Sequence, residues 1–334
     1  MVKFSVRFIH WRPLKEFIRV AQMMEAAGVD EVSIADDFTL DVPMWPVLFA
    51  IADNTQKITV GPGLTHPYIR HPSDTAKNLS LLDRVSNGRA VLEVGRGQDS
   101  SHQLMGVKMP KPMQAVREFI QVVRHYLRGE KKPFRGEVFT LTENAFLRWP
   151  VLRPELRIIL GTRGPKMIQL AGELCDEAEL AFCAMPFHMA EVRENIKIGA
   201  ARAGRNAAKV DIGVSPLIAI SDNKDEAIAH ARRVLPIVLH NLKPLDKVAG
   251  IERSELDTVE ALFYKGQLAE ASKHISERSI ASFSVCGNTK EFIAQTEALI
   301  NAGVQHFCFL EPGPDPQKSL ELIAKQVVPY FKGK

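Results

Sequence analysis

Short apolar runs alternate with longer amphipathic segments along nearly the whole chain. The short runs have the length of buried strands and predict eight of them, over 4–9, 31–35, 58–62, 90–95, 157–161, 178–182, 211–220 and 306–311. The segments between them repeat apolar residues at helical spacing and predict helices over 13–27, 44–54, 74–85, 113–127, 165–174, 188–203, 224–239 and 316–330. Glycines such as Gly28, Gly88 and Gly303 follow the last periodic residues, as is typical of helix ends.

Strands that alternate with helices predict an α/β fold with a parallel sheet, because parallel strands need crossover connections that are usually helical. Eight such units are also the number that closes a (β/α)8 TIM barrel. An open, doubly wound sheet is the alternative, and it usually shows G-x-G-x-x-G after its first strand. That position here reads His10-Trp11-Arg12-Pro13, which favours the barrel.

Two segments interrupt the repeat. Residues 131–155 contain FRGEVFTL, which is typical of a short hairpin, and residues 241–284 are mixed and helix-prone. Insertions of this size in a barrel lie beside the active-site mouth or at a dimer surface. We therefore expect one barrel domain, 1–334, that carries two insertions.

Composition narrows the class of protein. Of 334 residues, 46% are hydrophobic and 25% charged, which is ordinary for a soluble globular protein. A net charge of +4 argues against a nucleic-acid binder, whose basic residues cluster. The four cysteines form no CxxC pair, so we expect reduced thiols and no metal site. With no segment of membrane length and no signal peptide, we expect a cytoplasmic protein with a small-molecule substrate and neither nucleic-acid nor membrane partners.

Glycine recurs where the predicted strands end, which is where TIM barrels place their active sites. Four ends carry it, at Gly63, Gly95, Gly161 and Gly313. A rim of bare backbone amides suits a planar cofactor that bears phosphate.

The segment GTRGPKMIQLAGE, which begins at Gly161, is the best candidate for a phosphate site. Pro165 suits the first turn of a helix, so the amides from Gly164 onward point out of the helix N-terminus beside Arg163 and Lys166. A capped surface helix is the alternative. Arg96, on another loop, would add positive charge to the mouth, although a lone arginine is also typical of a solvated surface.

Charged residues at or inside the strands are further candidates. Asp36 and Asp37 follow the second strand and can act as acid–base groups or hold a cofactor ring nitrogen; alternatively, Asp37 caps the next segment. Arg7 and Glu93 interrupt apolar strands, and a buried charge needs a partner. We expect these two to pair inside the barrel, the alternative being that they reach solvent at the helix layer. His66 is expected to line the mouth.

Other barrel chemistries lack their residues. A metal-dependent hydrolase needs H-x-H after the first strand, a Schiff-base enzyme needs a lysine at an inner strand end, and serine catalysis needs G-x-S-x-G. None of these stands in the sequence.

Longer motifs resemble those of one family. The run VGPGLTHPYIRHPSDTAKNLSLLDRVSNGRAVLEVGRG, together with SIADDF, GTRGPKMIQLAGELCDEAEL and the closing GNTKEFIAQTEALINAGVQHFCFLEPGPDP, is similar to the luciferase-like flavin and deazaflavin oxidoreductases. Within them it resembles the branch that contains methylenetetrahydromethanopterin reductase, which uses the deazaflavin coenzyme F-420 (F420). The resemblance spans nearly the whole chain.

The resemblance implies a homodimeric TIM barrel with F420, or alternatively FMN, across its mouth. It also implies a cis peptide bond at Gly63–Leu64, in a bulge that backs the cofactor ring. The family aspartate corresponds to Asp36, and His66, which stands where the reductase has asparagine, is the second catalytic candidate. The expected cofactor-binding residues are Asp36, Gly63, Leu64, Thr65, Gly95, Arg96, Gly161, Thr162, Arg163, Gly164, Lys166 and Met167.

The function implied is an oxidoreductase that transfers a hydride between F420 and a small organic substrate. The alternatives are an FMN-dependent luciferase-like monooxygenase and a catalytically silent flavin-binding barrel. Asp37 stands where relatives commonly have histidine, and Glu93 stands where glycine is common. These two departures leave the substrate open.

Overall fold

The structure is a computed structural model that describes residues 2–37 and 39–333, so that Met1, Phe38 and Lys334 lie outside the described residues. Its strands are β1 (Lys3–Phe8), β2 (Glu31–Ile34), β3 (Thr59–Pro62), β4 (Leu92–Val94), β5 (Phe134–Arg135), β6 (Thr140–Leu141), β7 (Ile158–Thr162), β8 (Glu177–Ala181), β9 (Asp211–Ser215), β10 (Leu217–Ile220), β11 (Ser284–Gly287) and β12 (His306–Gly313). Its helices are α1 (Leu14–Ala27), α2 (Met44–Asp53), α3 (Pro72–Val85), α4 (Asp99–Leu104), α5 (Pro112–Leu127), α6 (Pro165–Leu174), α7 (Met189–Arg202), α8 (Lys224–Leu239), α9 (Leu245–Ala249), α10 (Arg253–Tyr264), α11 (Leu268–Ser272), α12 (Glu277–Phe283), α13 (Thr289–Asn301), α14 (Pro316–Leu322) and α15 (Val328–Lys332). Short 3-10 turns η1 (Pro186–His188) and η2 (Ala207–Lys209) and a π-helical turn η3 (Ile323–Val327) complete the elements.

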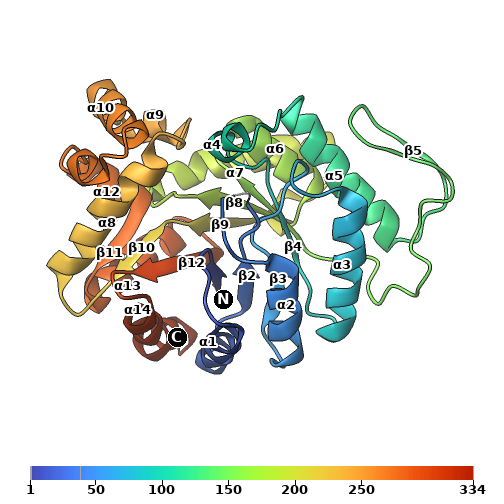
Figure 1. Ribbon diagram of the computed structural model, residues 1–334, viewed down its shortest axis with the longest axis horizontal. Helices are drawn as coiled ribbons and strands as arrows, with labels where there is room; N and C mark the ends of the chain where they lie inside the picture. The colour runs from blue at the N-terminus through green and yellow to red at the C-terminus, as the bar shows by residue number, and fades with distance from the viewer. Residues whose placement is uncertain (1, 38, 334) are drawn as a thin grey trace.

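Eight parallel strands form the barrel that the sequence predicts (Figure 1). Their hydrogen-bonded order is β3-β2-β1-β12-β9-β8-β7-β4, and parallel bridges at Val60–Ala90 and Thr65–Val94 join β4 to β3. The strands thus follow one another around the barrel in chain order, with helices outside them. Their carboxyl ends all lie at one end of the barrel, called the mouth below.

Side chains of β1 alternate between two environments, as the pleat of a strand requires. Phe4 and Phe8 face the helix layer: Phe4 stacks on Phe309 of β12 with ring centroids 5.5 Å apart, and Phe8 meets Phe17 of α1 at 5.5 Å. Arg7 points the other way, into the barrel, and is buried. The apolar core therefore lies between strands and helices, whereas the interior of the barrel is polar.

The motif LDRVSNGRA lies at the end of the barrel opposite the mouth. Arg89 donates hydrogen bonds to the backbone oxygens of Ala52, Thr55, Ile58 and Ser86, at 2.5–2.9 Å. One guanidinium thereby ties the end of α2, the start of β3 and the turn after α3 together. This part of the family motif is structural.

The hairpin expected in FRGEVFTL is confirmed as β5–β6, which projects from the barrel (Figure 1). Glu118 of α5 holds its turn: the buried carboxylate accepts backbone N–H groups of Glu137, Val138 and Phe139 at 2.7–2.8 Å. The insertion 241–284 is helical, as expected, and contains α9–α12.

The sequence patterns miss α4, β11 and α13 and misplace two boundaries. Of the missed elements, α4 follows β4, and β11 and α13 lie between the insertion and the last barrel strand. The single strand expected over 211–220 divides at Pro216, which has no N–H for the ladder, and β10 pairs outward with β11. The helix expected over 316–330 is broken by η3, because Pro329 has no N–H for the preceding turn.

No helix among the described residues combines the length and apolar character needed to span a bilayer.

Candidate active site

Asp36 lies at the mouth, between the end of β2 and the loop after β3. Its buried carboxylate accepts the Thr65 hydroxyl at 2.7 Å and both nitrogens of a bidentate Arg70, each at 3.0 Å. The three side chains hold each other in place across two strand ends. Asp36 is thus presented as a fixed hydrogen-bond acceptor beside the floor of the mouth.

The adjacent Asp37 has a local role. Its carboxylate accepts the backbone N–H and the hydroxyl of Thr39, at 2.9 and 2.8 Å. This agrees with the interpretation of Asp37 as a cap on the next segment, since both bonds close a short turn.

The bulge after β3 has the expected backbone. The peptide bond Gly63–Leu64 is cis. The Gly63 N–H donates to Ile34 O at 2.7 Å, the Thr65 N–H donates to Glu93 O at 3.1 Å, and Gly95 returns an N–H to Thr65 O at 2.9 Å. The bulge is therefore bonded to both neighbouring strands.

Leu64 extends from this bulge across the top of the barrel, toward β7. A Cβ built on Gly161 would lie 2.1 Å from Leu64 Cδ2, and one built on Gly95 would lie 2.7 Å from Leu64 Cδ1. Both glycines make room for that side chain. The sequence interpretation of Gly95 as a bare amide is wrong, because its N–H is used by Thr65.

His66 and His102 form a buried pair on the loops after β3 and β4. Their ring centroids are 4.8 Å apart, and Nδ1 of His102 donates to Gln98 O at 2.5 Å. Burial, together with the neighbouring His102, lowers the pKa of His66 to about 4. His66 is therefore a neutral hydrogen-bonding group near neutral pH. The sequence did not indicate its partner, because His102 lies 36 positions away, on the helix α4 that the pattern missed.

The N-terminus of α6 has the geometry that the sequence predicts for an anion site. Gly164 is the N-cap and Pro165 the first helical residue, while Lys166 is exposed on the first turn. Arg163 donates to the carbonyl of Asn241, so the insertion reaches this end of the helix. Burial lowers the pKa of Arg163 to about 10, and the nearby positive charge of Arg96 acts in the same direction. Thr162 is buried at the end of β7 and Met167 is half-buried.

Two further mouth arginines are paired with carboxylates. Arg96 forms two hydrogen bonds with Asp99, at 2.7 and 2.8 Å. Arg12 pairs with Glu311, whose other oxygen accepts the backbone N–H groups of Ile9 and His10 at 2.6 and 2.8 Å. Arg163 and Lys166 form no ion pair among the described residues.

The interior below the mouth contains the pair that the sequence predicts. Arg7 pairs with Glu93, and it also forms a bidentate pair with Glu179 at 2.8 Å for each bond. Its Nε donates to Ser33 Oγ at 3.3 Å, and Ser215 Oγ donates to Glu179 at 2.9 Å. The expected pairing of Arg7 with Glu93 is confirmed.

A second interior group lies closer to the opposite end. His306 contacts Glu177 at 2.7 Å through Nδ1 and Ser5 Oγ at 2.8 Å through Nε2, while Arg157 bonds Glu177 at 2.5 Å. Glu177, Glu179 and His306 lie close enough together to hold a metal ion. Their polar atoms are instead engaged with one another and with the arginines of the interior.

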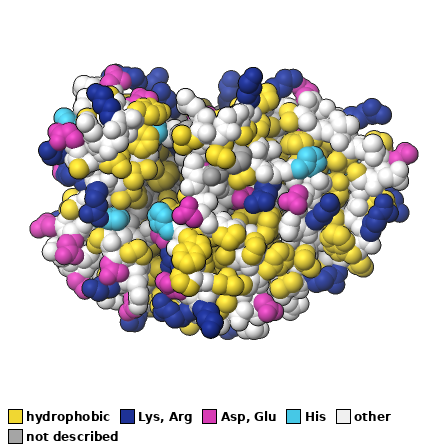
Figure 2. Space-filling view, viewed as in Figure 1, with side chains coloured by type: hydrophobic (Ala, Val, Ile, Leu, Met, Phe, Trp, Pro, Cys, Tyr) yellow, Lys and Arg dark blue, Asp and Glu magenta, His cyan; other side chains and the backbone are white. Residues whose placement is uncertain are grey.

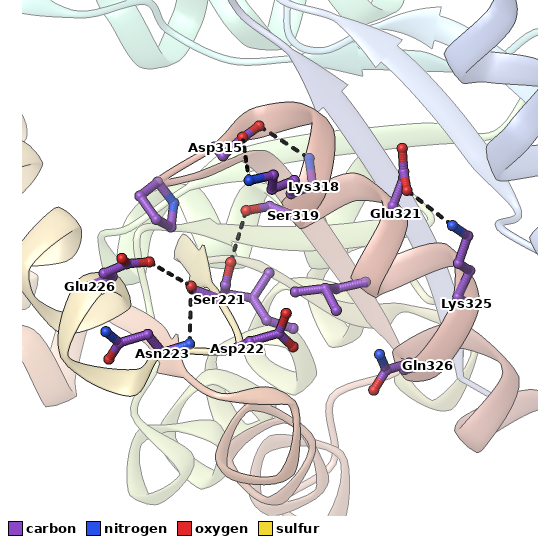
Figure 3. A pocket seen from close by; sticks show the side chains of 13 residues that line it. Ser221, Asp222, Asn223, Glu226, Asp315, Lys318, Ser319, Glu321, Lys325 and Gln326 are labelled. Atoms are coloured by element: carbon purple, nitrogen blue, oxygen red, sulfur yellow. Dashed lines mark hydrogen bonds and ion pairs between the residues drawn. The ribbon is translucent and has the colours of Figure 1, made fainter.

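A cavity of about 460 Å³ lies between the loop after β10 and α14 and is lined by other residues (Figure 3). Its polar groups pair among themselves: Ser221 with Glu226 at 3.0 Å, Lys318 with Asp315 at 3.8 Å, and the Ser319 hydroxyl with a backbone oxygen. We therefore place the candidate site at the mouth.

Comparison with known proteins shows which family the chain resembles. The sequence model of the luciferase-like monooxygenase family matches residues 6–306. The chain is 30% identical to 5,10-methylenetetrahydromethanopterin reductase of Archaeoglobus fulgidus, over 99% of this chain and 100% of that protein. It is 24% identical to F420-dependent glucose-6-phosphate dehydrogenase of Nakamurella multipartita, over 95% and 92%. The fold superposes on coenzyme F420-dependent tetrahydromethanopterin reductase from Methanopyrus kandleri with a TM-score of 0.89, at 25% identity over 99% of both chains.

Proposed function

Since the chain belongs to the luciferase-like monooxygenase family, we propose that it is an oxidoreductase that transfers a hydride between F420 and a small organic substrate. Relatives named for two different activities, a reductase and a sugar-phosphate dehydrogenase, are both F420-dependent. The coenzyme is therefore common to relatives whose substrates differ.

This proposal rests on one observation: the Leu64 side chain, called the floor below, and an anion site lie at the same mouth of the barrel. Leu64 covers the barrel interior, with Asp36 and Thr65 beside it. The N-terminus of α6 offers amides and the cations Arg163 and Lys166, which form no ion pair within the described part of the chain. A planar ring joined to a phosphate-bearing tail fits this arrangement.

We assign the ring to Asp36, Gly63, Leu64 and Thr65, the phosphate to 161–167, and the acidic tail to Arg96 and Arg163. When bound, F420 supplies a ring carbon that accepts or donates the hydride. Leu64 excludes water from below the ring, and Asp36 accepts a hydrogen bond at a fixed place. His66, which is neutral, orients the substrate by hydrogen bonding rather than by proton transfer.

We infer that the substrate itself is uncharged. Arg12 and Arg70 already pair with carboxylates, and the other mouth cations named above among the described residues, Arg96, Arg163 and Lys166, are assigned to the coenzyme. Trp11 after β1 and Phe187 after β8 are 60% and 68% exposed and offer apolar surface on the same loops. A matched pair of substrates, with and without a phosphate group, tests this: the phosphorylated one should have no advantage in KM, and a tenfold advantage would contradict the inference.

Lys166→Ala tests the anion site. Losing a charge-assisted contact should weaken F420 binding by about tenfold, and added salt should reduce the difference. Lys209→Ala is the matched control, because Lys209 is equally exposed but precedes β9 at the opposite end of the barrel. Equal effects of the two substitutions would contradict the assignment.

Titration of the protein with F420 and with FMN tests the coenzyme. We expect micromolar binding of F420 and weaker binding of FMN. Tighter binding of FMN would favour the luciferase-like monooxygenase, and failure of both would refute all enzyme assignments. Binding of F420 without hydride exchange with any donor would favour the catalytically silent barrel.

We further propose that the chain forms one domain, 1–334, and that two copies form a homodimer. The surface over α2 and α3 is the proposed dimer interface. Hydrophobic side chains gather there in Figure 2. Leu81 and Val85 of α3 are 47% and 39% exposed, and Trp149 bonds Ser80 of the same helix. Leu81→Asp should yield a monomer in sedimentation experiments, whereas Ile198→Asp on α7, 45% exposed in the native protein, should not.

We place the protein in the cytoplasm. Its cysteines, Cys175, Cys183, Cys286 and Cys308, are buried thiols. A reducing compartment suits them.

A further inference from the structure

The Leu64 side chain packs against two glycines on adjacent strands, which are together called the seat of Leu64 below. Gly95 follows β4 and Gly161 lies in β7, and these strands pair through Val94 and Leu160. The Leu64 methyl carbons would lie 2.7 and 2.1 Å from a Cβ at the two positions. Ordinary contacts of this kind are 3.4–4 Å, so any side chain at 161 would have to displace Leu64 by more than 1 Å.

The bulge that carries Leu64 is also supported from below. A Cβ on Gly63 would lie 2.2 Å from Ser33 Oγ and 2.8 Å from Arg7 Nε. Arg7 cannot yield, because two 2.8 Å bonds hold it to Glu179 on the opposite side of the barrel. Leu64 therefore cannot sink into the interior. Its height is set by the glycines beside it and by the ion pair beneath it.

We propose that Gly95 and Gly161 are positioning residues that fix the height of the Leu64 side chain, and with it the plane in which the coenzyme ring lies. This rests on the proposed function, since it requires F420 at the mouth. The half-buried Leu64 is the contact between the seat and the ring. The two glycines act on the ring plane through Leu64.

The test is a steric exchange. Gly161→Ala should raise the floor and weaken F420 binding by about tenfold, with the absorption spectrum of the bound coenzyme shifted toward that of the free coenzyme. Adding Leu64→Ala to Gly161→Ala removes the overlapping methyl groups. The double variant should bind F420 within about threefold of the wild type, which a merely structural role of Gly161 would not produce.

Gly213→Ala is the matched control. Its Cβ would lie 2.0 Å from Glu177 Oε1, an overlap of the same size in the lower interior. It should lower the free energy of unfolding and leave the F420 Kd within about threefold of the wild type. If Gly161→Ala fails to fold, Leu64→Ala alone tests the proposal. Removal of the Leu64 methyl groups should lower the plane of the coenzyme ring and shift the absorption spectrum of the bound coenzyme.

The outcomes separate the two proposals. A wild-type protein that binds no F420 refutes the proposed function and the seat with it. Wild-type binding with an unchanged Kd and spectrum in Gly161→Ala refutes the seat alone, as does a Gly213→Ala variant that matches Gly161→Ala. Failure of Leu64→Ala to restore binding also refutes it.

Discussion

Replacing Glu31 by glutamine isolates one titration inside the barrel. Glu31 of β2 and Glu93 of β4 are buried, and one carboxyl oxygen of each has no hydrogen-bond partner among the described residues. An ionised carboxylate is unfavourable in such surroundings, so these two groups favour retaining a proton. Burial raises the pKa of Glu31 to about 7, and it also raises the pKa of Glu93, which accepts from Arg7 as well. A cavity of about 570 Å³ at the end opposite the mouth is lined by Glu31 and admits solvent for proton exchange.

The magnitude follows from the shift. The ordinary value for Glu31 is 4.5, so its folded-state pKa is higher by about 2.5 units, and at about 1.4 kcal/mol per unit this is about 3 kcal/mol. The folded protein holds a proton that the unfolded chain releases. Stability is therefore full below about pH 4.5 and is lost as the pH rises toward about 7. The other charged groups that face the pair, Arg157, Glu177, Glu179 and His306, remain in both proteins.

Glutamine at position 31 cannot ionise, and it keeps the size and a polar amide group at that position. The stability of Glu31→Gln relative to the wild type should rise by about 3 kcal/mol between about pH 4.5 and about pH 7.5. Urea unfolding at several pH values measures this difference. Glu143→Gln, an exposed carboxylate, is the control for charge alone. A difference that does not change with pH refutes the raised pKa of Glu31, and a difference of the opposite sign would show that Glu31 is ionised.

Three further predictions concern single side chains. Arg89→Ala should lower the free energy of unfolding by about 3 kcal/mol or more, because several buried carbonyls lose their donor; urea unfolding measures it, and a loss below about 1 kcal/mol would contradict the proposed clamp. Glu118→Gln should weaken the β5–β6 turn by about 1–2 kcal/mol and speed limited proteolysis within 131–141, and an unchanged cleavage rate would count against this. His66 should titrate near pH 4 by NMR, and stability should fall as the pH drops from about 6.5 to about 4, because the unfolded chain takes up the proton first; an NMR value above about 6 would contradict its burial.

The barrel could be predicted because its signals are local. Alternation along β1 separates Phe4 and Phe8 from Arg7, and a charge within an apolar strand demands a partner on another strand. Glu93 is likewise a charge within an apolar strand. The pairing of Arg7 with Glu93 could therefore be predicted although the sequence does not give the distance between them. Glu179 is also a charge within a predicted strand, 178–182. The residues around it did not mark it as a partner of Arg7.

The unit β11–α13 escaped because its strand carries little signal. Ser284–Gly287 is four residues long and contains serine, cysteine and glycine, which have weak strand preference. It pairs outward with β10 and follows the helix α12 without a break. Packing rather than propensity determines it.

The glycines of the mouth show a different limit. A glycine at a strand end marks close approach of some group, and the sequence cannot say which. At Gly161 that group is Leu64, 97 positions earlier, so the reason for the glycine appears only when the chain is folded. The phosphate interpretation of the same segment rests on Gly164 and Pro165, whose helix N-terminus is local and could be predicted.

The polar interior is explained by what rests on it. Burying Arg7 with Glu93 and Glu179 carries a desolvation cost that a packed apolar interior would avoid, so the network does not by itself argue for stability. Its geometry does argue for position: Arg7 lies against Gly63 and is held from the far side of the barrel, directly under the bulge that carries Leu64. An apolar side chain at the position of Arg7 could change rotamer when the bulge packs against it, whereas the bidentate ion pair of Arg7 with Glu179 has one arrangement. We infer that the charges inside this barrel serve the floor of its site.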